Sequence, residues 1–498
     1  MRGGIVMSTA GTVPAVSRWY RAMSWMLIGH LFTTITFDVL GLDLILPAIA
    51  GVFQALGLRA LRRENRWFAR AYPCMVLLAV YRLFWLLAGF TIWYGFLSEL
   101  PVIHVLFWGF LVLRGVVLFL LWKGVGEAAA KAGIPGTEKP FLGLLIWYMV
   151  TVGITLLFTR IGFPLSIGFF IVYGVLLHRA FQTVRALDDV GFLPAEAELR
   201  PSDAAVGWSV FGLIVAGFLV GYFVLNQYPM HWTPRLETEQ AAAADTRQTL
   251  LDLGYPQAAL ADLAPEHIAA CKGAADLSVE IRYHRLDGKQ SIVDYTSWSG
   301  EEPPRWGFPD GYDLAILSVA VRLPGDDAVR WRIFHHFIWL EEPDTRYTDA
   351  LRIHSADQSC ENWIMSGPPA GRLLIDRSGH TETAEFAVLE KRTTTSYFLL
   401  WGTTSSQDWY GGFSFPDDGS APRGYLTYSV EDIKSRQAMK LDSDAVYHHQ
   451  RSQFMYPVCT AVEAYSQNSF GMAPLFDSME GSVFVYLSAD EPALVSDP

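Results

Sequence analysis

Long apolar runs alternate with short polar segments over the first 230 residues of the chain. A helix needs about 20 apolar residues to cross a hydrocarbon layer about 30 Å thick. Four runs of sufficient length cover residues 73–97, 101–122, 141–159 and 205–227. A fifth run, 163–177, is shorter but apolar except for Ser166 and Tyr173, and local thinning of a bilayer accommodates a short span. The pattern predicts a bundle of membrane-spanning helices.

The first apolar stretch, residues 22–58, is too long for one ordinary span and contains Asp38 and Asp43 around Gly41. A carboxylate at the centre of a spanning helix costs about 2.5–3.5 kcal/mol. Two short helices joined by a turn at 38–43 place both carboxylates at the membrane surface instead. We therefore expect seven spans, and the alternative is six spans with one long tilted helix over this stretch.

From residue 278 onward the pattern changes to short runs rich in Val, Ile, Phe, Tyr, Trp and Thr. Turn residues separate these runs, with Pro324-Gly325-Asp326-Asp327 as one hairpin turn, and an amphipathic helix is expected only at 431–440. In 329–340 both alternating faces are partly apolar, which predicts a central strand. The candidate strands are 278–284, 312–323, 329–340, 371–377, 383–391, 395–402, 409–415, 423–430 and 481–488. This spacing is typical of an antiparallel β-sandwich or jelly roll.

Three regions follow from these patterns. Residues 1–229 form a polytopic transmembrane α-helical bundle, and residues 276–498 form an α+β region dominated by the antiparallel β-sandwich or jelly roll. Between them, residues 230–275 read as a short helical neck with helices at 236–253, 257–263 and 265–272. Gly254-Tyr255-Pro256 provides a glycine helix end and a proline stop.

Charge predicts the orientation of the bundle. With seven spans, one side receives residues 1–21, 59–72, 123–140 and 179–204, which carry 14 Lys or Arg, whereas the turns on the other side carry Arg160 alone. Because basic loops stay in the cytoplasm, we expect a multi-pass cell-membrane protein with a cytoplasmic N-terminus and an extracytoplasmic C-terminal domain. That placement of the C-terminal domain is the same with six spans.

Composition agrees with a membrane protein: 51% of the residues are apolar, 18% are charged and the mean hydropathy is +0.23. Residues 230–498 carry 21 basic against 39 acidic side chains. Such an acidic region argues against nucleic acid as a partner, because phosphate binding needs clustered Lys and Arg. The expected partners are the lipid bilayer and, on the outer side, a glycan or a protein.

Two arginines lie inside predicted spans. Arg82 is nine residues from Pro73 and Arg114 is nine residues from Lys123, on neighbouring antiparallel helices. The two guanidinium groups at one depth form a candidate intramembrane anion site for a lipid phosphate or an anionic substrate. The alternative is that each snorkels or bonds to helix carbonyls and polar neighbours.

The external region contains eight tryptophans, and three of them fall in loop-like sequence. Exposed aromatic rings stack on the apolar faces of sugars, so Trp298, Trp306 and Trp409, with the adjacent Tyr410, are candidate ligand-binding residues. Asp408, Asp417 and Asp418 lie in Gly-rich sequence beside them, where turn-forming aspartates are the simpler interpretation.

No spacing of histidines and cysteines predicts a metal site or a cofactor. The pairs His335-His336 and His448-His449 would each offer one ligand per sheet face, since neighbouring strand residues point to opposite faces. Cys271, Cys360 and Cys459 allow one disulfide in an oxidising compartment, and we favour Cys360 with Cys459. No local pair of carboxylates singles out a catalytic site.

These features favour a polytopic envelope protein that presents an external β-rich domain for ligand binding or protein interaction. A protein without enzymatic activity is favoured over an enzyme. The first alternative is a membrane-anchored extracytoplasmic hydrolase of polysaccharide or cell-wall material. The second is a transport or lipid-handling protein that depends on Arg82 and Arg114.

Overall fold

The computed structural model of the chain consists of two compact units, Met1–Gly221 and Tyr222–Pro498. Each unit has apolar cores of its own. The structure describes residues 17–36, 41–157, 163–197, 200–236, 239, 243–286, 292–296, 310–324, 329–359, 361–398, 402–432, 440–452, 455–466 and 475–486.

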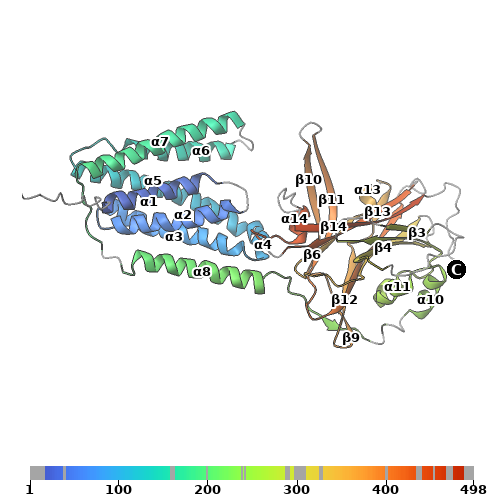
Figure 1. Cartoon of the computed structure of the whole chain (residues 1–498). Coiled ribbons are helices and arrows are strands. Elements are labelled where there is room, and N and C mark those ends of the chain that lie inside the picture. Colours follow the sequence, from blue (N-terminus) through green and yellow to red (C-terminus); the bar gives the residue numbers. More distant parts are fainter. Residues whose placement is uncertain are drawn as a thin grey trace, which may run out of the picture. The chain divides into compact units, whose positions relative to one another are not determined.

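The first unit is helical (Figure 1). Its helices are α1 (Arg18–Thr34), α2 (Leu42–Leu61), α3 (Arg66–Ala88), α4 (Trp93–Glu99), α5 (Pro101–Lys131), α6 (Lys139–Leu157), α7 (Phe163–Asp189) and α8 (Asp203–Val224). Among the described residues, six helices are long and apolar enough to cross a membrane, namely α2, α3, α5, α6, α7 and α8. Helix α1 has 17 residues and is not among these six.

The first apolar stretch forms two helices, as predicted, and not one long helix. Helix α1 ends where Ile35 becomes extended, and α2 begins after Gly41, whose φ of 68° lies in the left-handed region that glycine tolerates. The two helices are antiparallel, because Gly57 of α2 lies against Ala22 of α1 and Gly29 of α1 lies against Ala50 of α2. Asp43 falls in the first turn of α2, where a carboxylate suits the helix dipole, and Asp38 lies outside the described residues.

Two predicted spans have different ends in the structure. Helix α3 begins at Arg66 because Asn65 caps it, its side chain accepting hydrogen bonds from the backbone N–H groups of Trp67 and Phe68. Helix α5 begins with Pro101 in its first turn and continues to Lys131. The run 101–122 therefore forms only the apolar part of a longer helix.

The second unit contains two antiparallel sheets. The nine-stranded sheet has the order β1-β9-β8-β12-β5-β4-β2-β3, with β7 also paired to β12, and the five-stranded sheet has the order β10-β11-β6-β13-β14. The strands of the first sheet are β1 (Thr233–Pro234), β2 (Asp276–His284), β3 (Ile292–Thr296), β4 (Leu314–Leu323), β5 (Arg330–Trp339), β7 (Trp363–Met365), β8 (Ala370–Arg377), β9 (His380–Ala384) and β12 (Ser420–Asp432). Those of the second are β6 (Asp349–His354), β10 (Val388–Phe398), β11 (Gly402–Phe413), β13 (Lys440–Gln450) and β14 (Phe476–Tyr486).

One apolar core is shared by the two sheets. Strand β5 lies between β12 and β4, which confirms the predicted central strand. Its two faces separate as the alternation predicts: Ile333 and Phe337 belong to the core between the sheets, and Phe334 belongs to a different core. The turn at Pro324-Gly325-Asp326-Asp327 lies largely outside the described residues, but the flanking strands pair antiparallel.

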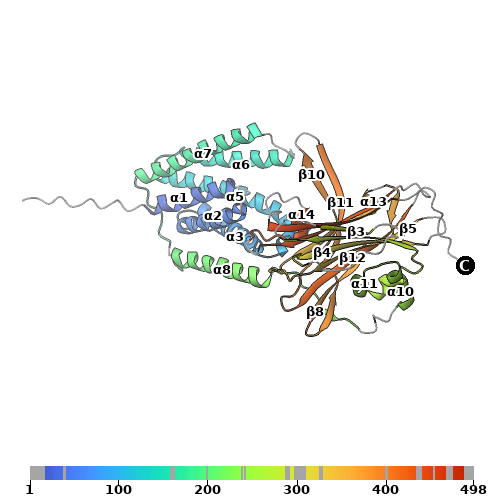
Figure 2. The same ribbon diagram turned by 45° about the vertical axis from the view of Figure 1, so that its right-hand side comes forward.

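The helices that the sequence assigns to the neck pack on the large sheet. They are α10 (Ala244–Asp252), α11 (Gln257–Asp262) and α12 (Pro265–Ala269). Their apolar side chains, such as Leu250 and Ile268, share a core with Ile281, Leu317 and other residues of the sheet. Figure 2 shows α10 and α11 beside the strands. Two further helices belong to this unit, α13 (Ala356–Ser359) and α14 (Ala461–Ser466), and α14 shares a core with the five-stranded sheet.

Two predicted elements in this part of the chain differ in their described residues. Most of the expected helix, 433–439, lies outside the described residues, and of its ends Asp432 belongs to β12 and Lys440 begins β13. In β13 Leu441, Ala445 and Tyr447 face the core at a spacing of two, which is the period of a strand. The single run 383–391 is divided between β9 and β10, which belong to different sheets.

Candidate functional site

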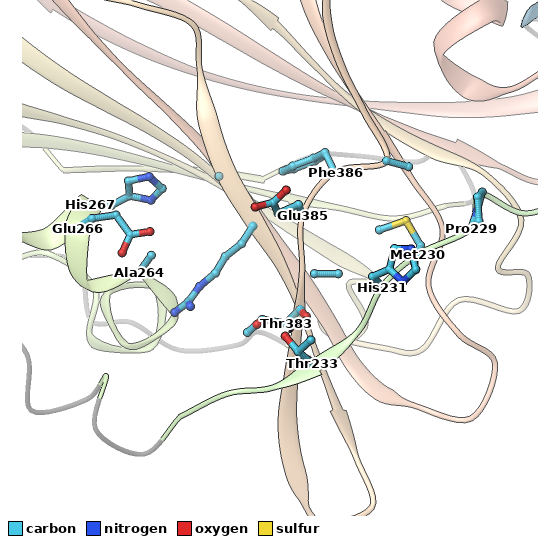
Figure 3. A pocket seen from close by; sticks show the side chains of 14 residues that line it. Pro229, Met230, His231, Thr233, Ala264, Glu266, His267, Thr383, Glu385 and Phe386 are labelled. Carbon is cyan, nitrogen blue, oxygen red and sulfur yellow. Dashed lines mark hydrogen bonds between the residues drawn. The ribbon is translucent and has the colours of Figure 1, made fainter.

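A pocket of about 540 Å³ lies where the chain crosses from one sheet to the other. Residues 385–387 connect β9 to β10 and line it, together with the segment that leads into β1, the start of α12 and the start of β8. Figure 3 shows Glu266 and His267 on one side and Met230 and His231 on the other, with Glu385 and Phe386 between them. Every lining residue belongs to the second unit.

Tyr425 of β12 fixes the helical side of the pocket. Its hydroxyl accepts a hydrogen bond from the backbone N–H of Ala264 at 2.9 Å and lies 2.7 Å from Nδ1 of His267, to which we assign the hydroxyl as donor. Burial, reinforced by the guanidinium of Arg332, lowers the pKa of His267 to about 4. The imidazole is therefore neutral at pH 7, and because Nδ1 is the acceptor, the ring proton is on Nε2. The ring thus offers one N–H donor at the pocket.

A close backbone approach brings β8 to the pocket. A Cβ at Gly371 would collide with the carbonyl oxygen of Tyr425, because β8 and β12 pair at this point. Only glycine allows the two backbones to come this near. The next residue, Arg372, then reaches the pocket wall.

Arg372 is held by two acceptors. Its Nη1 donates to Glu239 at 2.8 Å and its Nε donates to the carbonyl oxygen of Asp262 at 3.0 Å, while Nη2 is buried without a hydrogen-bond partner among the described residues. Burial alone would raise the pKa of Glu239, but the hydrogen bond from Arg372 and the positive charges of Arg372 and Arg235 together lower the pKa. Glu239 is therefore ionised at neutral pH.

A second ion pair, between Asp262 and Arg423, fixes the end of helix α11. Asp262 accepts hydrogen bonds from Nε of Arg423 at 3.0 and 3.1 Å. Burial raises the pKa of Asp262, although Arg423 acts in the opposite direction. The end of α11, which carries the acceptor for Arg372, is thus tied to β12.

The rim of the pocket is polar and exposed. Glu266, Glu385 and His231 are all solvent-exposed, and neither glutamate forms an ion pair with a residue that the structure describes. Phe386 is half-buried and packs edge-on against Phe413 at 5.4 Å, so its ring is held in place. Carboxylate acceptors, an imidazole N–H and a guanidinium beside an apolar ring are groups that bind a ligand with several hydroxyls.

The aromatic residues singled out from the sequence are Trp298, Trp306, Trp409 and Tyr410, and none of them is a described lining residue of this pocket. Trp298 and Trp306 are outside the described residues. Trp409 is half-buried on β11 beside the core of the two sheets, and its indole N–H has no described hydrogen-bond partner. Tyr410 has no exposed surface and shares an apolar core with α14, and its ligand-binding role stays a prediction.

The two arginines of the predicted intramembrane anion site contact polar neighbours. Arg114 donates to the carbonyl oxygen of Thr33 at 3.0 Å and to the hydroxyl of Thr34 at 2.5 Å, in the last turn of α1, where a cation suits the helix dipole. Nη1 of Arg82 lies 3.5 Å from Oε1 of Gln54. Among the described residues, neither arginine forms an ion pair with a carboxylate. The anion site at Arg82 and Arg114 stays a prediction.

The paired histidines point to opposite faces, as the alternation predicts. His335 bonds to Ser318 and Ser443 between the sheets, whereas His336 bonds to Tyr255 of the helical layer. No group of His, Cys, Asp and Glu that could hold a metal ion occurs among the described residues. Cys459 is a free thiol, which contradicts the predicted disulfide with Cys360, and Cys360 itself lies outside the described residues.

The pocket could not be predicted from the sequence, because its residues come from four separate segments of the chain. Arg372, Glu266 and Glu385 show no spacing that links them, and each reads alone as a surface charge. Neither a protein-family model nor a curated protein sequence matches this chain. The function is therefore inferred from the geometry of the pocket.

Proposed function

We propose that the chain is a multi-pass cell-membrane protein whose C-terminal β-sandwich binds a hydroxyl-rich ligand, a glycan, on the extracytoplasmic side. The six long apolar helices and the basic segments between them support the membrane placement. The two sheets with a common core support the sandwich.

The observation that carries the binding role is the pocket at residues 385–387. Its carboxylates, Glu266 and Glu385, are acceptors for sugar hydroxyls, while His267 and Arg372 are donors. Phe386 and Met230 offer apolar surface against which a sugar ring packs. A pocket of about 540 Å³ is of the size that small-molecule sites have.

The test is thermal unfolding of the full-length protein in neutral detergent, with a panel of neutral and acidic glycans and cell-wall fragments. A ligand at 100 times its dissociation constant adds about 2.7 kcal/mol to the free energy of unfolding, which raises the midpoint measurably. We expect one glycan class to raise it. A hydrogen bond to a charged group contributes about 1.5–3 kcal/mol, so Glu385→Gln should weaken binding about tenfold or more.

Glu341→Gln is the matched control, because Glu341 is exposed in the same unit but does not line the pocket. It should bind the glycan as the unchanged protein does. If no glycan raises the midpoint, or if Glu385→Gln and Glu341→Gln bind equally, the pocket is not the glycan site.

A second candidate function is hydrolysis of a glycosidic bond. It is favoured by one observation: Glu266 and Glu385 come from different elements and line the same pocket, and glycosidases act through two carboxyl groups. In that case single changes of Glu266 or Glu385 to Gln should abolish release of a chromophore from aryl glycosides. A glycan that binds but is not cleaved would contradict the hydrolase function and would support the binding function only.

A further inference from the structure

A second cavity, of about 270 Å³, lies within the helical unit between α2, α3 and α8. Its walls are apolar over most of their length. They include Val52 and Leu56 of α2, Val76 and Val80 of α3, and Val206 and Val210 of α8. At one end the lining changes to Arg59, Arg62, Arg200 and Tyr72.

Helix α8 is attached to the bundle at both of its ends. Near its start, Nη1 of Arg59 lies 3.5 Å from Oδ1 of Asp203, and Nη2 of Arg59 donates to the carbonyl oxygen of Pro201. Near its end, a Cβ at Gly217 or Gly221 would collide with Leu87 or Phe90, so the helices touch there through glycine. Between these two contacts the cavity is lined by residues of α2, α3 and α8.

Charge is concentrated at one end of this cavity. Among its described lining residues three are arginines and none is a carboxylate, and Arg59 pairs with Asp203 at the start of α8. Arg62 lies with its guanidinium 5.6 Å from the ring centre of Tyr72, and Arg200 is exposed and makes no ion pair with a described residue. The end that carries Arg62 and Arg200 therefore has an excess of positive charge.

We propose that this cavity binds one anionic phospholipid. Its phosphate lies between Arg62 and Arg200, and one acyl chain fills the apolar space between α3 and α8. Basic pockets between membrane helices bind anionic lipid head groups, and the apolar wall matches a hydrocarbon chain. The inference rests on the proposed membrane placement, but not on the glycan pocket, which belongs to the other unit.

The experiment uses the full-length protein in neutral detergent and compares dioleoyl phosphatidylglycerol with dioleoyl phosphatidylcholine in mixed micelles. We expect phosphatidylglycerol to raise the midpoint of thermal unfolding and phosphatidylcholine to have little effect. The double variant Arg62→Gln and Arg200→Gln should weaken the phosphatidylglycerol effect about tenfold in lipid concentration. Arg63→Gln with Arg70→Gln is the control, because it removes the same charge from exposed positions outside the cavity.

Two steric variants test the acyl-chain part without a change of charge. Val210→Trp fills the cavity and should also weaken the phosphatidylglycerol effect, whereas Val215→Trp lies on an exposed part of α8 and should not. Equal behaviour of the two charge variants, or of the two tryptophan variants, overturns the proposal. So does equal stabilisation by glycerol phosphate, which would show a free-anion site.

A photoreactive benzoylphenylalanine in place of Val80 identifies the occupant in intact membranes. An adduct with the mass of an anionic phospholipid supports the proposal, and an adduct with another protein overturns it. Extraction of the same membranes with alkaline carbonate tests the membrane placement separately, because an integral protein stays in the pellet whether or not the cavity binds lipid.

Discussion

At the scale of single residues, Asp408 and His354 form an ion pair on the five-stranded sheet. Nδ1 of His354 lies 2.7 Å from Oδ1 of Asp408, and Ser406 donates a hydrogen bond to the other carboxylate oxygen at 3.1 Å. The hydrogen bond that His354 donates to Asp408 raises the pKa of His354, although partial burial opposes it. Burial alone would raise the pKa of Asp408, but the hydrogen bond from His354, together with the nearby charge of Arg352 and the hydrogen bond from Ser406, lowers it.

These two shifts define the pH range in which the pair stabilises the fold. A raised histidine pKa contributes stability that is present below about 6.5, the unfolded value, and is lost as the pH rises through the folded pKa. A lowered aspartate pKa contributes stability that is present above about 3.9 and is lost as the pH falls through the folded pKa. The pair therefore stabilises the fold most between about pH 4 and 6.5.

Asp408→Asn should consequently destabilise the protein more at pH 5.5 than at pH 8.5. A hydrogen bond between charged groups contributes about 1.5–3 kcal/mol, so we expect a difference of about 1–2 kcal/mol between the two pH values. Thermal unfolding of the full-length protein, followed by tryptophan fluorescence, measures it.

Asp418→Asn is the control for that experiment. Asp418 pairs with Arg377, which does not titrate in this range, so its loss should have the same small effect at both pH values. If Asp408→Asn lowers the free energy of unfolding equally at pH 5.5 and 8.5, Asp408 does not raise the pKa of His354, and the account of this pair is contradicted.

Sequence reasoning placed Asp408 in a Gly-rich turn beside Trp409-Tyr410, because aspartate and glycine are common in turns. In the structure Asp408 is within the long strand β11, opposite Arg392 of β10 and level with His354 of β6. The partner that satisfies this carboxylate is 54 residues away in sequence. Composition alone does not reveal such a partner.

At the scale of elements, the α1–α2 hairpin depends on close approach of two helices. A Cβ at Gly57 would lie 2.5 Å from the carbonyl oxygen of Ala22, and a Cβ at Gly29 would lie 2.8 Å from that of Ala50. Small residues at a helix interface let the backbones approach in a membrane, where no hydrophobic force drives helices together.

Gly57→Ala should therefore destabilise the helical unit, by about 1–3 kcal/mol, because the backbone of α1 has to move. Gly153→Ala is the control: it is within helix α6 and a Cβ there would have no neighbour within 4 Å. It should be neutral or stabilising by up to about 1 kcal/mol, since alanine favours helix. Far-ultraviolet circular dichroism during heating of the full-length protein compares the two. Equal midpoints for both variants would contradict the close packing of the hairpin.

Elements with a strong apolar period were predictable, and elements that depend on polar partners were not. The helices of the first unit and strands β4, β5 and β12 follow from apolar runs of the right length and period. Strand β13 was missed because Asp442, Ser443 and Asp444 interrupt its apolar pattern. Ser443 is nevertheless fully buried, where it bonds to His335 and to Tyr428.

At the scale of the whole molecule, the division into a helical unit and a β-rich unit was predictable from the change in hydropathy, and the pocket was not. Residues 229–233, 264–267, 371–372 and 383–387 meet only after the two sheets and the helical layer have formed. The helices expected to form a separate neck carry apolar side chains, such as Leu260 and Ile268, that the sheet buries. Their packing brings Glu266 and His267 to the pocket.

The number of spans is tested by the side of the N-terminus. Seven spans with α1 inserted place the two ends of the chain on opposite sides, and six spans place them on the same side. Green fluorescent protein fused to the N-terminus in a bacterial host fluoresces only in the cytoplasm. We expect fluorescence, and a dark fusion with a normal amount of full-length protein would favour six spans.

The side of the C-terminal unit is the most direct test of the proposed function, because a glycan-binding domain needs access to the cell exterior. Alkaline phosphatase, which folds to an active enzyme only outside the cytoplasm, is fused to the C-terminus and its activity is measured in intact cells, beside a C-terminal green fluorescent protein fusion. High phosphatase activity with a dark fluorescent fusion is the predicted result. An inactive phosphatase with a bright fluorescent fusion would place the β-rich unit in the cytoplasm and contradict the proposal.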